Sequence, residues 1–276
     1  MTDPTLAHDL RIETGRGAIF ARMWWEKASL HDAPPPIVLF HDSLGAVDLW
    51  RSFPQALAGA TGRPVIAYDR LGFGRSDAFP GALPADFIEA EGRDTLPLLR
   101  ESFGFAPFVA CGHSVGGGMA VETAGRYRET CLAVITMGAQ AFIEDRTLDG
   151  IRVARAAFQQ PEELARLARY HDDKARWVVD AWTETWLSPD FAGWTLDKAL
   201  GKVACPLLAI HGDADEFGSP AHPGRIAEGR GRAVLLPGIG HNPHREAEAQ
   251  TVAMIAGFLA GLDGHADQGL GLGAGA

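Results

Sequence analysis

The stretch that decides the fold of this chain is Phe108-Val109-Ala110-Cys111-Gly112-His113-Ser114-Val115-Gly116-Gly117-Gly118. Its apolar first half is typical of a buried strand, and a helical pattern follows its glycines. Strands that lead directly into helices are the building units of α/β proteins. The Gly-x-Ser-x-Gly pattern at the junction predicts a tight turn with Ser114 at its tip, because small neighbours leave room for a strained backbone.

Strand and helix patterns alternate on both sides of this turn. Several of the strand candidates are apolar throughout, as expected when helices cover both faces of a parallel sheet. We therefore predict an α/β fold with a mostly parallel central sheet flanked by helices. The predicted strands are Ala18–Trp24, Ile37–His41, Pro64–Tyr68, Phe108–Cys111, Leu132–Met137, Leu207–His211 and Ala233–Leu236. The predicted helices are Trp50–Ala60, Pro84–Phe103 (kinked or ended by Pro97), Gly116–Arg128 and Ala247–Leu262.

Residues 141–202 interrupt the alternation, since they contain helical patterns and no convincing strand. One helix is expected to begin at Pro161, where proline and two following acids suit a first turn. In the next helix Val178, Trp182 and Trp186 are spaced to share one face. The tryptophans of this segment either pack the insert onto the sheet, or an apolar pocket is lined by Trp182, Trp186, Phe191 or Trp194. We predict a core of residues 1–140 and 203–262, a helical insert over 141–202, and a disordered Gly/Ala-rich tail over 263–276.

The composition is that of an ordinary globular protein, with 46% hydrophobic and 22% charged residues in 276. A net charge of −10 argues against a partner that needs a basic face, so we expect neither nucleic acid nor an anionic membrane as partner. The N-terminus has no signal-peptide pattern and no apolar run is long enough for a membrane span, which predicts a cytoplasmic protein. Cys111, Cys131 and Cys205 are expected to be buried free thiols, with no zinc or redox spacing and no metal site.

Two later loops carry residues that suit catalysis by Ser114. A serine hydroxyl is a weak nucleophile unless a histidine, oriented by a carboxylate, takes its proton. Asp213 and Asp215 follow the strand ending at His211, whereas His241 and His244 follow the last predicted strand. Both loops, like the Ser114 turn, belong to the carboxyl edge of the sheet, where sites of open α/β sheets gather.

The sequence resembles the α/β-hydrolase fold superfamily, in the form that carries a helical cap. The resemblance extends from about Ile12 to Leu262 and rests on four motifs in order. These are Phe40-His41-Asp42-Ser43-Leu44-Gly45, Asp69-Arg70-Leu71-Gly72-Phe73-Gly74-Arg75-Ser76-Asp77, the Gly-x-Ser-x-Gly turn and Gly240-His241. It implies an α/β-hydrolase fold with residues 141–202 as the cap.

The resemblance also implies a role for each catalytic candidate. Ser114 would be the nucleophile, His241 the general base and then acid, and Asp215 the orienting carboxylate. Asp213 is the alternative acid and His244 the alternative base. His113 occupies the variable position of the turn and is expected not to be catalytic.

An oxyanion hole would need two backbone N–H groups. Val115 is expected to supply one and Ser43 the other, with Leu44 as the alternative. Asp42 stands where the family usually has glycine, and its Cβ is expected to narrow this loop. The Ser43 hydroxyl is a further candidate donor, although exposure to solvent or local capping explains it equally well.

The implied function is that of a cofactor-free serine hydrolase. It would act on an ester, thioester or lactone with a small apolar acyl group, held in a pocket lined by Trp182 and Trp186. The same residues would also serve a C–C bond hydrolase, a perhydrolase or haloperoxidase, a lyase, or a receptor with slow turnover. The serine argues against dehalogenases and epoxide hydrolases, which use aspartate at this turn. The expected partner is a small-molecule substrate, and exposed cap tryptophans would form the face of a homodimer.

Overall fold

The chain folds around a single eight-stranded sheet with the order β1-β2-β4-β3-β5-β6-β7-β8. This computed structural model describes residues 6–26 and 33–269, the last six by their backbone alone. Strand β2 pairs antiparallel with β1 and β4, and the remaining strands run parallel. The strands are β1 (Leu6–Thr14), β2 (Gly17–Trp25), β3 (Ile37–Phe40), β4 (Val65–Tyr68), β5 (Phe108–His113), β6 (Cys131–Met137), β7 (Leu207–Gly212) and β8 (Gly231–Leu236).

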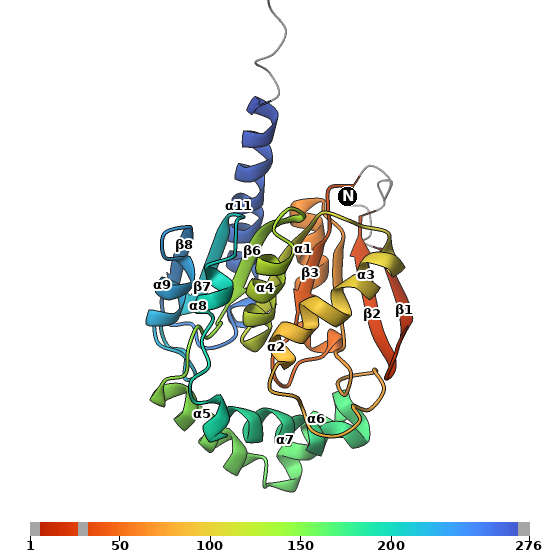
Figure 1. Cartoon of the computed structure of the whole chain (residues 1–276), viewed down its shortest axis with the longest axis vertical. Helices are drawn as coiled ribbons and strands as arrows, with labels where there is room; N and C mark the ends of the chain where they lie inside the picture. Colours follow the sequence, from red (N-terminus) through yellow and green to blue (C-terminus); the bar gives the residue numbers. More distant parts are fainter. Residues whose placement is uncertain (1–5, 27–32, 270–276) are drawn as a thin grey trace, which may run out of the picture.

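Helices cover both faces of the sheet (Figure 1). Apolar side chains of α2, α3, α4, α8 and α9 pack on one face, and those of α1 and α11 on the other. The helices are η2 (Val47–Trp50), α1 (Phe53–Thr61), α2 (Phe87–Ala90), η3 (Glu91–Thr95), α3 (Leu96–Phe103), α4 (Val115–Arg126), α5 (Asp145–Ala157), α6 (Pro161–His171), η4 (Asp172–Lys174), α7 (Ala175–Trp186), η5 (Pro189–Phe191), α8 (Asp197–Leu200), α9 (Ala221–Ala227), α10 (Pro243–Glu246) and α11 (Glu248–Gly269). Strands β3 to β7 are buried almost throughout, which explains their continuous apolar sequences.

The α/β fold and the mostly parallel sheet are confirmed. Every predicted strand is present, with ends shifted by two residues at most. Strand β1 was not predicted, because it is an edge strand of mixed polarity in which only Ile12 is buried. The predicted helix Pro84–Phe103 is divided: the π-helical turn η3 separates α2 from α3, and Pro97 lies in the first turn of α3.

Helices α5, α6 and α7, which we call the cap, lie across one edge of the sheet (Figure 1). They come from the predicted insert, whereas α8 packs back on α4. The proposed division of the chain at residues 140 and 203 remains a prediction. His171, at the end of α6, joins the cap to the core: its Nδ1 accepts from the Gly74 N–H at 2.9 Å, and its Nε2 donates to the Leu44 carbonyl at 3.0 Å.

The C-terminal segment is more ordered than the sequence predicts. Residues 263–276 were predicted to be disordered, but α11 continues to Gly269. Arg63 binds the Asp263 carboxylate at 2.7 Å, which ties this part of the helix to the core. The rest of the predicted tail, 270–276, lies outside the described residues. Within the described chain no helix is both long and apolar enough to cross a membrane.

Cys111 and Cys131 are buried free thiols, as the sequence predicts, and Cys205 is half-buried. The spacing along the chain gave no sign of a cysteine pair. The structure nevertheless brings Cys131, at the start of β6, within 4.0 Å (Sγ–Sγ) of Cys205, which precedes β7. The two strands are neighbours in the sheet, so residues far apart in sequence meet at its amino edge.

Candidate active site

Ser114 stands at the turn between β5 and α4, with φ 54° and ψ −126°. This left-handed region is unfavourable for a residue with a side chain. Glycines make the turn possible: a Cβ on Gly112 would collide with the backbone of Gly116, and one on Gly116 with the carbonyl of Phe40. The motif therefore has a steric cause, and it presents Ser114 at the carboxyl edge of the sheet.

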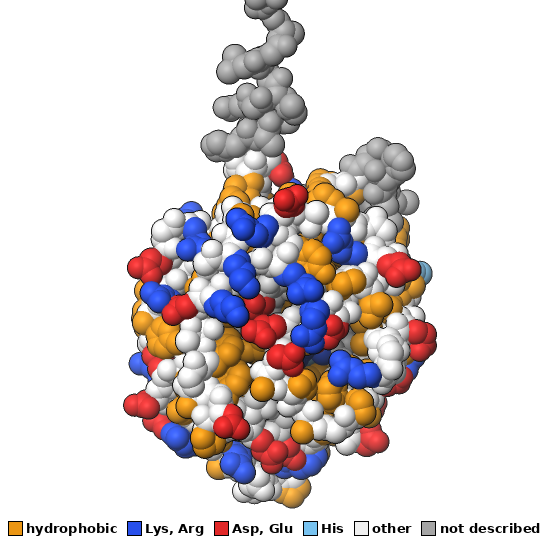
Figure 2. Space-filling model, viewed as in Figure 1, with side chains coloured by type: hydrophobic (Ala, Val, Ile, Leu, Met, Phe, Trp, Pro, Cys, Tyr) orange, Lys and Arg blue, Asp and Glu red, His pale blue; other side chains and the backbone are white. Residues whose placement is uncertain are grey.

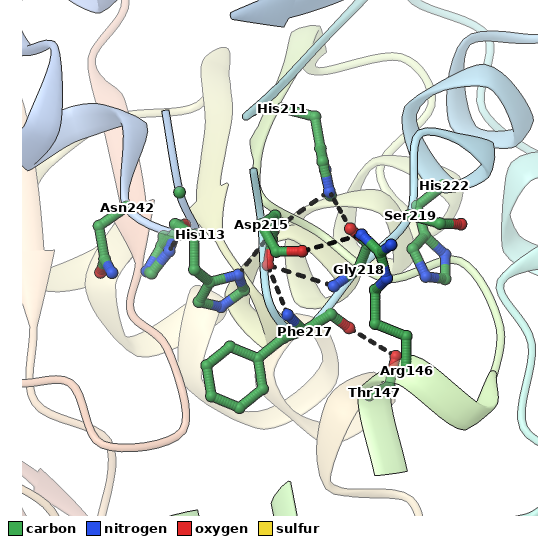
Figure 3. Close-up of polar contacts among 12 residues, drawn as sticks. His113, Arg146, Thr147, His211, Asp215, Phe217, Gly218, Ser219, His222 and Asn242 are labelled. Carbon is green, nitrogen blue, oxygen red and sulfur yellow. Dashed lines mark hydrogen bonds and ion pairs between the residues drawn. The ribbon is translucent and has the colours of Figure 1, made fainter. Parts of the chain in front are cut away.

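The loop after β7 carries a buried carboxylate that is bonded on both oxygens (Figure 3). Asp215 Oδ1 accepts the N–H groups of Phe217 at 2.7 Å and Gly218 at 3.2 Å. Its Oδ2 lies 2.8 Å from His241 Nδ1 and 3.1 Å from His211 Nε2. Burial opposes ionisation, but these hydrogen bonds hold the pKa of Asp215 well below its usual range.

An ionised Asp215 sets the proton position on His241. The carboxylate accepts a hydrogen bond, so Nδ1 carries the proton and Nε2 of the neutral ring keeps its lone pair. Burial alone would lower the pKa of His241, but the hydrogen bond and charge of Asp215 outweigh it and raise that pKa. The ring is thus arranged as a base whose protonated form is stabilised.

The cap holds the loop of Asp215 in place. Arg146 donates to the Asp215 carbonyl at 3.1 Å, and Thr147 Oγ1 donates to the Phe217 carbonyl at 2.6 Å. Both residues belong to α5, and Figure 3 shows them beside the loop. A link between the cap and the acid loop was not apparent from the sequence, because neither residue belongs to a motif.

The alternative candidates have other partners. Asp213 lies on the exposed side of its loop, where Oδ1 accepts the Gly238 N–H at 2.7 Å. His244 is buried, with its ring 4.9 Å from Trp50 and 4.5 Å from His113. Burial lowers the pKa of His244 well below its ordinary value. The structure therefore brings Asp215 and His241 together and leaves both alternatives outside this pair.

Ser114 and His241 line the same cavity, of about 390 Å³, between the sheet edge and the cap. Within the described chain the Ser114 hydroxyl makes no hydrogen bond. Hydrogen bonds between a nucleophile and its base are often long or absent before substrate binds. The apolar walls of the cavity are formed by Leu44, Leu49, Ile151, Phe158, Leu167, Trp182, Trp186 and Phe217.

Two residues that line the cavity carry buried polar atoms that the sequence did not suggest. Of the residues expected to line a pocket, Trp182 and Trp186 line this cavity, whereas Phe191 and Trp194 do not. Trp186 also packs against Phe191 and Trp194, so it both lines the cavity and contributes to the packing of this segment. Its Nε1 and the Oε1 of Gln140 are buried with no hydrogen-bond partner among the described residues. Both residues are only 3% exposed.

Two backbone N–H groups near Ser114 are unengaged by the part of the chain that is described: those of Ser43 and Val115. Val115 is the first residue of α4, where a helix has no internal acceptor for its N–H. The Leu44 N–H is already bonded to Asp42 Oδ1 at 2.8 Å, which disfavours this alternative donor. The Asp42 side chain thus accepts a hydrogen bond from the backbone of its own loop.

His113 links the loops around the cavity. Its Nδ1 lies 3.2 Å from Asp42 Oδ2, and its Nε2 lies 2.9 Å from the His241 carbonyl oxygen. Burial opposes the ionisation of Asp42, but the His113 hydrogen bond and the charge of Arg245 hold the pKa of Asp42 well below its usual range. Sequence reasoning treated His113 as a variable residue, because only the fold places these loops together.

The described residues contain no group of three or more His, Cys, Asp or Glu side chains arranged to hold a metal ion. The site consists of a serine on a strained turn, a buried Asp-His pair, and the N–H groups of Ser43 and Val115, which are unengaged within the described chain; Ser43, Ser114 and His241 line one cavity. This arrangement suits nucleophilic attack on an acyl carbon with stabilisation of the resulting oxyanion.

Comparison with known proteins agrees with this architecture. Serine hydrolase BPHL of Homo sapiens is 30% identical over 190 residues, which cover 65% of this chain and 64% of that protein. The chain thus spans just under two thirds of this relative.

Two solved structures share the fold. The 2-hydroxy-6-oxo-6-phenylhexa-2,4-dienoate hydrolase of a Rhodococcus species has a TM-score of 0.74 and 19% identity, covering 91% of this chain and 99% of that one. The enol-lactonase of Burkholderia xenovorans has a TM-score of 0.69 and 20% identity, covering 91% and 100%. A model of the alpha/beta hydrolase fold family matches residues 35–191. The chain therefore belongs to the alpha/beta hydrolase fold family.

Proposed function

We propose that this protein is a serine hydrolase that cleaves an ester, thioester or lactone through Ser114, His241 and Asp215. The observation that carries the proposal is the 2.8 Å hydrogen bond between Asp215 and His241, whose ring faces the same cavity as Ser114. A serine on a strained turn beside a carboxylate-oriented histidine has the parts that nucleophilic catalysis needs.

In the first half-reaction Ser114 Oγ attacks the acyl carbon while His241 Nε2 takes the hydroxyl proton. The N–H groups of Ser43 and Val115 donate to the oxyanion of the tetrahedral intermediate. When the intermediate collapses, His241 gives its proton to the leaving oxygen or sulfur, and the acyl group remains on Ser114. Asp215 stabilises the imidazolium throughout without taking its proton.

In the second half-reaction water attacks the acyl-serine. His241 takes a proton from that water, and the Ser43 and Val115 N–H groups again hold the oxyanion. Collapse releases the carboxylic acid and returns the proton to Ser114 Oγ. The enzyme is restored, so the overall reaction consumes one ester and one water.

The cap contributes the walls of the acyl pocket. Trp182 and Trp186 of α7 face the cavity that contains Ser114, and Phe158 and Leu167 extend the apolar wall. About 390 Å³ suits a substrate of modest size. Trp186 Nε1 and Gln140 Oε1 belong to residues of this wall and are buried without a partner in the described chain, so we expect an acyl group with a polar atom to be preferred over a pure hydrocarbon.

The test is hydrolysis of p-nitrophenyl acetate, butyrate and octanoate by the wild type and the Ser114→Ala variant. We expect turnover by the wild type and a loss on the order of 10³-fold or more in the variant. A fluorophosphonate probe should label the wild type once and leave Ser114→Ala unlabelled.

Ser102→Ala, at an exposed position of α3, is the matched control and should behave as wild type. Activity that survives in folded Ser114→Ala would contradict the role of Ser114. A folded wild type that is neither active nor labelled would contradict the proposal as a whole and direct attention to C–C substrates.

A further inference from the structure

The walls of the active-site cavity are positively charged, although the protein as a whole carries −10. On the face shown in Figure 2, acidic and basic side chains are interspersed. The cavity differs, because it has four cationic side chains against two carboxylates. The charged residues that line it are Arg51, Arg166, Arg169, Arg245, Asp42 and Glu163.

The two carboxylates leave most of this positive charge unpaired. Glu163 pairs with Arg166 within α6. The Asp42 carboxylate is engaged by the Leu44 N–H and by His113. Arg51, Arg169 and Arg245 form no ion pair with any residue that the structure describes. Three cations, one directly after η2, one in α6 and one in α10, thus line one cavity without an ion pair in the described chain, although Arg245 lies near enough to Asp42 for their charges to interact.

Arg245 is held in a fixed position at this cavity. It lies on α10, four residues after His241, and its Nη2 donates to the Leu49 carbonyl at 2.9 Å. Its Nε is buried and has no hydrogen-bond partner among the described residues. The Leu49 contact fixes the guanidinium of a residue that lines the cavity, so its positive charge acts there.

Arg51 is presented by a strained backbone. Its φ is 54°, and among the described residues only Ser114 and Asp172 share a positive φ without being glycine. Two of these three residues line the same cavity. Strain of this kind is typical of functional positions, and a merely solubilising arginine has no need of it. The Arg51 side chain makes no hydrogen bond or ion pair with the described part of the chain.

We propose that the substrate carries a carboxylate that binds Arg51 and Arg245 while its ester group lies at Ser114. This inference rests on the proposed hydrolase function. A guanidinium presents two parallel N–H groups that match the two oxygens of a carboxylate. Arg169, on the cap, adds positive potential from the opposite wall. The substrate is therefore a monoester or a carboxylated lactone, and the neutral ester of the same shape is the poorer substrate.

The test compares mono-p-nitrophenyl adipate with its methyl ester, after subtraction of spontaneous hydrolysis. We expect the anionic ester to have the higher kcat/KM, through a lower KM. Arg51→Gln and Arg169→Gln should each lower the ratio of kcat/KM between the two esters, Arg51→Gln by about tenfold. Arg155→Gln, an exposed arginine of α5 that does not line this cavity, is the matched control and should leave the ratio unchanged. Added salt should reduce the preference.

Three outcomes are distinguishable. A neutral ester that is hydrolysed as well as the anionic one, or a ratio that stays unchanged in both variants, overturns the carboxylate proposal and leaves the hydrolase intact. Hydrolysis of neither ester counts against the hydrolase function. In that case calorimetric titration with adipate tests the arginines separately: binding that weakens in Arg51→Gln supports them, and no binding by the wild type overturns the inference.

Discussion

His113 Nε2 lies 2.9 Å from the backbone carbonyl oxygen of His241. The other ring nitrogen reaches Asp42, in the loop that contains Ser43. One imidazole therefore connects the loop of the proposed base to the loop of the proposed oxyanion hole. His113 contacts no reacting atom in this arrangement, so its role is one of positioning.

Replacing His113 should disturb catalysis more than binding. In His113→Phe the ring volume is retained among its aromatic neighbours, but the polar contacts of both ring nitrogens are lost. We expect kcat for p-nitrophenyl butyrate to fall about tenfold, because the loops of His241 and Ser43 are no longer held together through one side chain. KM should change little. Steady-state kinetics would show this split, and circular dichroism would show that the variant is folded.

His244→Phe is the matched control for that variant. The two histidines are in ring contact, but His244 makes no hydrogen bond with the described residues. Its replacement should leave kcat within about twofold. Equal losses in both variants would mean that packing, and not the polar contacts of His113, sets the geometry.

The strain at Ser114 should be measurable as stability. With φ at 54°, Ser114→Gly relieves an unfavourable backbone conformation, whereas Ser114→Ala does not. Relief of this strain should make the free energy of unfolding of Ser114→Gly about 1 kcal/mol higher than that of Ser114→Ala. The greater flexibility of glycine in the unfolded chain offsets part of this gain. Both variants should be inactive. Thermal unfolding followed by circular dichroism compares them, and a glycine variant less stable than the alanine one would contradict strain at this turn.

The sequence was informative where local sterics decide the structure. The glycines around Ser114 predicted the turn, because only residues without a side chain allow the backbone segments on either side of it to approach so closely. The strands β3 to β7 were predicted because burial on both faces requires apolar runs. The edge strand β1 has no such requirement, since most of its side chains are exposed.

The network behind the site could not be predicted in the same way. His113 and Arg146 contact loops that are distant from them in the sequence. The sequence alone does not show which of these distant segments will lie side by side. The two aspartates after β7 were both reasonable candidates from their spacing, and only the fold turns Asp215 inward and Asp213 toward Gly238.

The acid limb of activity should depend on Asp215. His241 acts as a base only when it is neutral, so kcat/KM should fall as the pH drops through its pKa, which Asp215 raises above 6.5. In Asp215→Asn that charge is lost, so the limb should move to lower pH. At the same time kcat should fall on the order of 10³- to 10⁴-fold, because the ring loses its orientation.

A pH profile of kcat/KM for the wild type and Asp215→Asn measures both effects. Asp213→Asn is the control: its side chain is on the same loop but, among the described residues, accepts a hydrogen bond only from the Gly238 N–H, so the variant should retain wild-type pH dependence. A profile displaced in Asp213→Asn and unchanged in Asp215→Asn would reverse the assignment of the acid.

The unpartnered Nε1 of Trp186 should give the acyl pocket a preference for an oxygen atom. We expect p-nitrophenyl 4-methoxybutanoate to be hydrolysed with a higher kcat/KM than the hexanoate of equal length, because its ether oxygen accepts the buried N–H. Trp186→Phe should reduce this preference by about fivefold to tenfold, since the donor is lost and an aromatic ring remains. Trp194→Phe is the control, because Trp194 packs against Trp186 but does not line the cavity. If the hexanoate is the better substrate of the wild type, or if Trp186→Phe leaves the ratio unchanged, the Trp186 N–H does not recognise the acyl group.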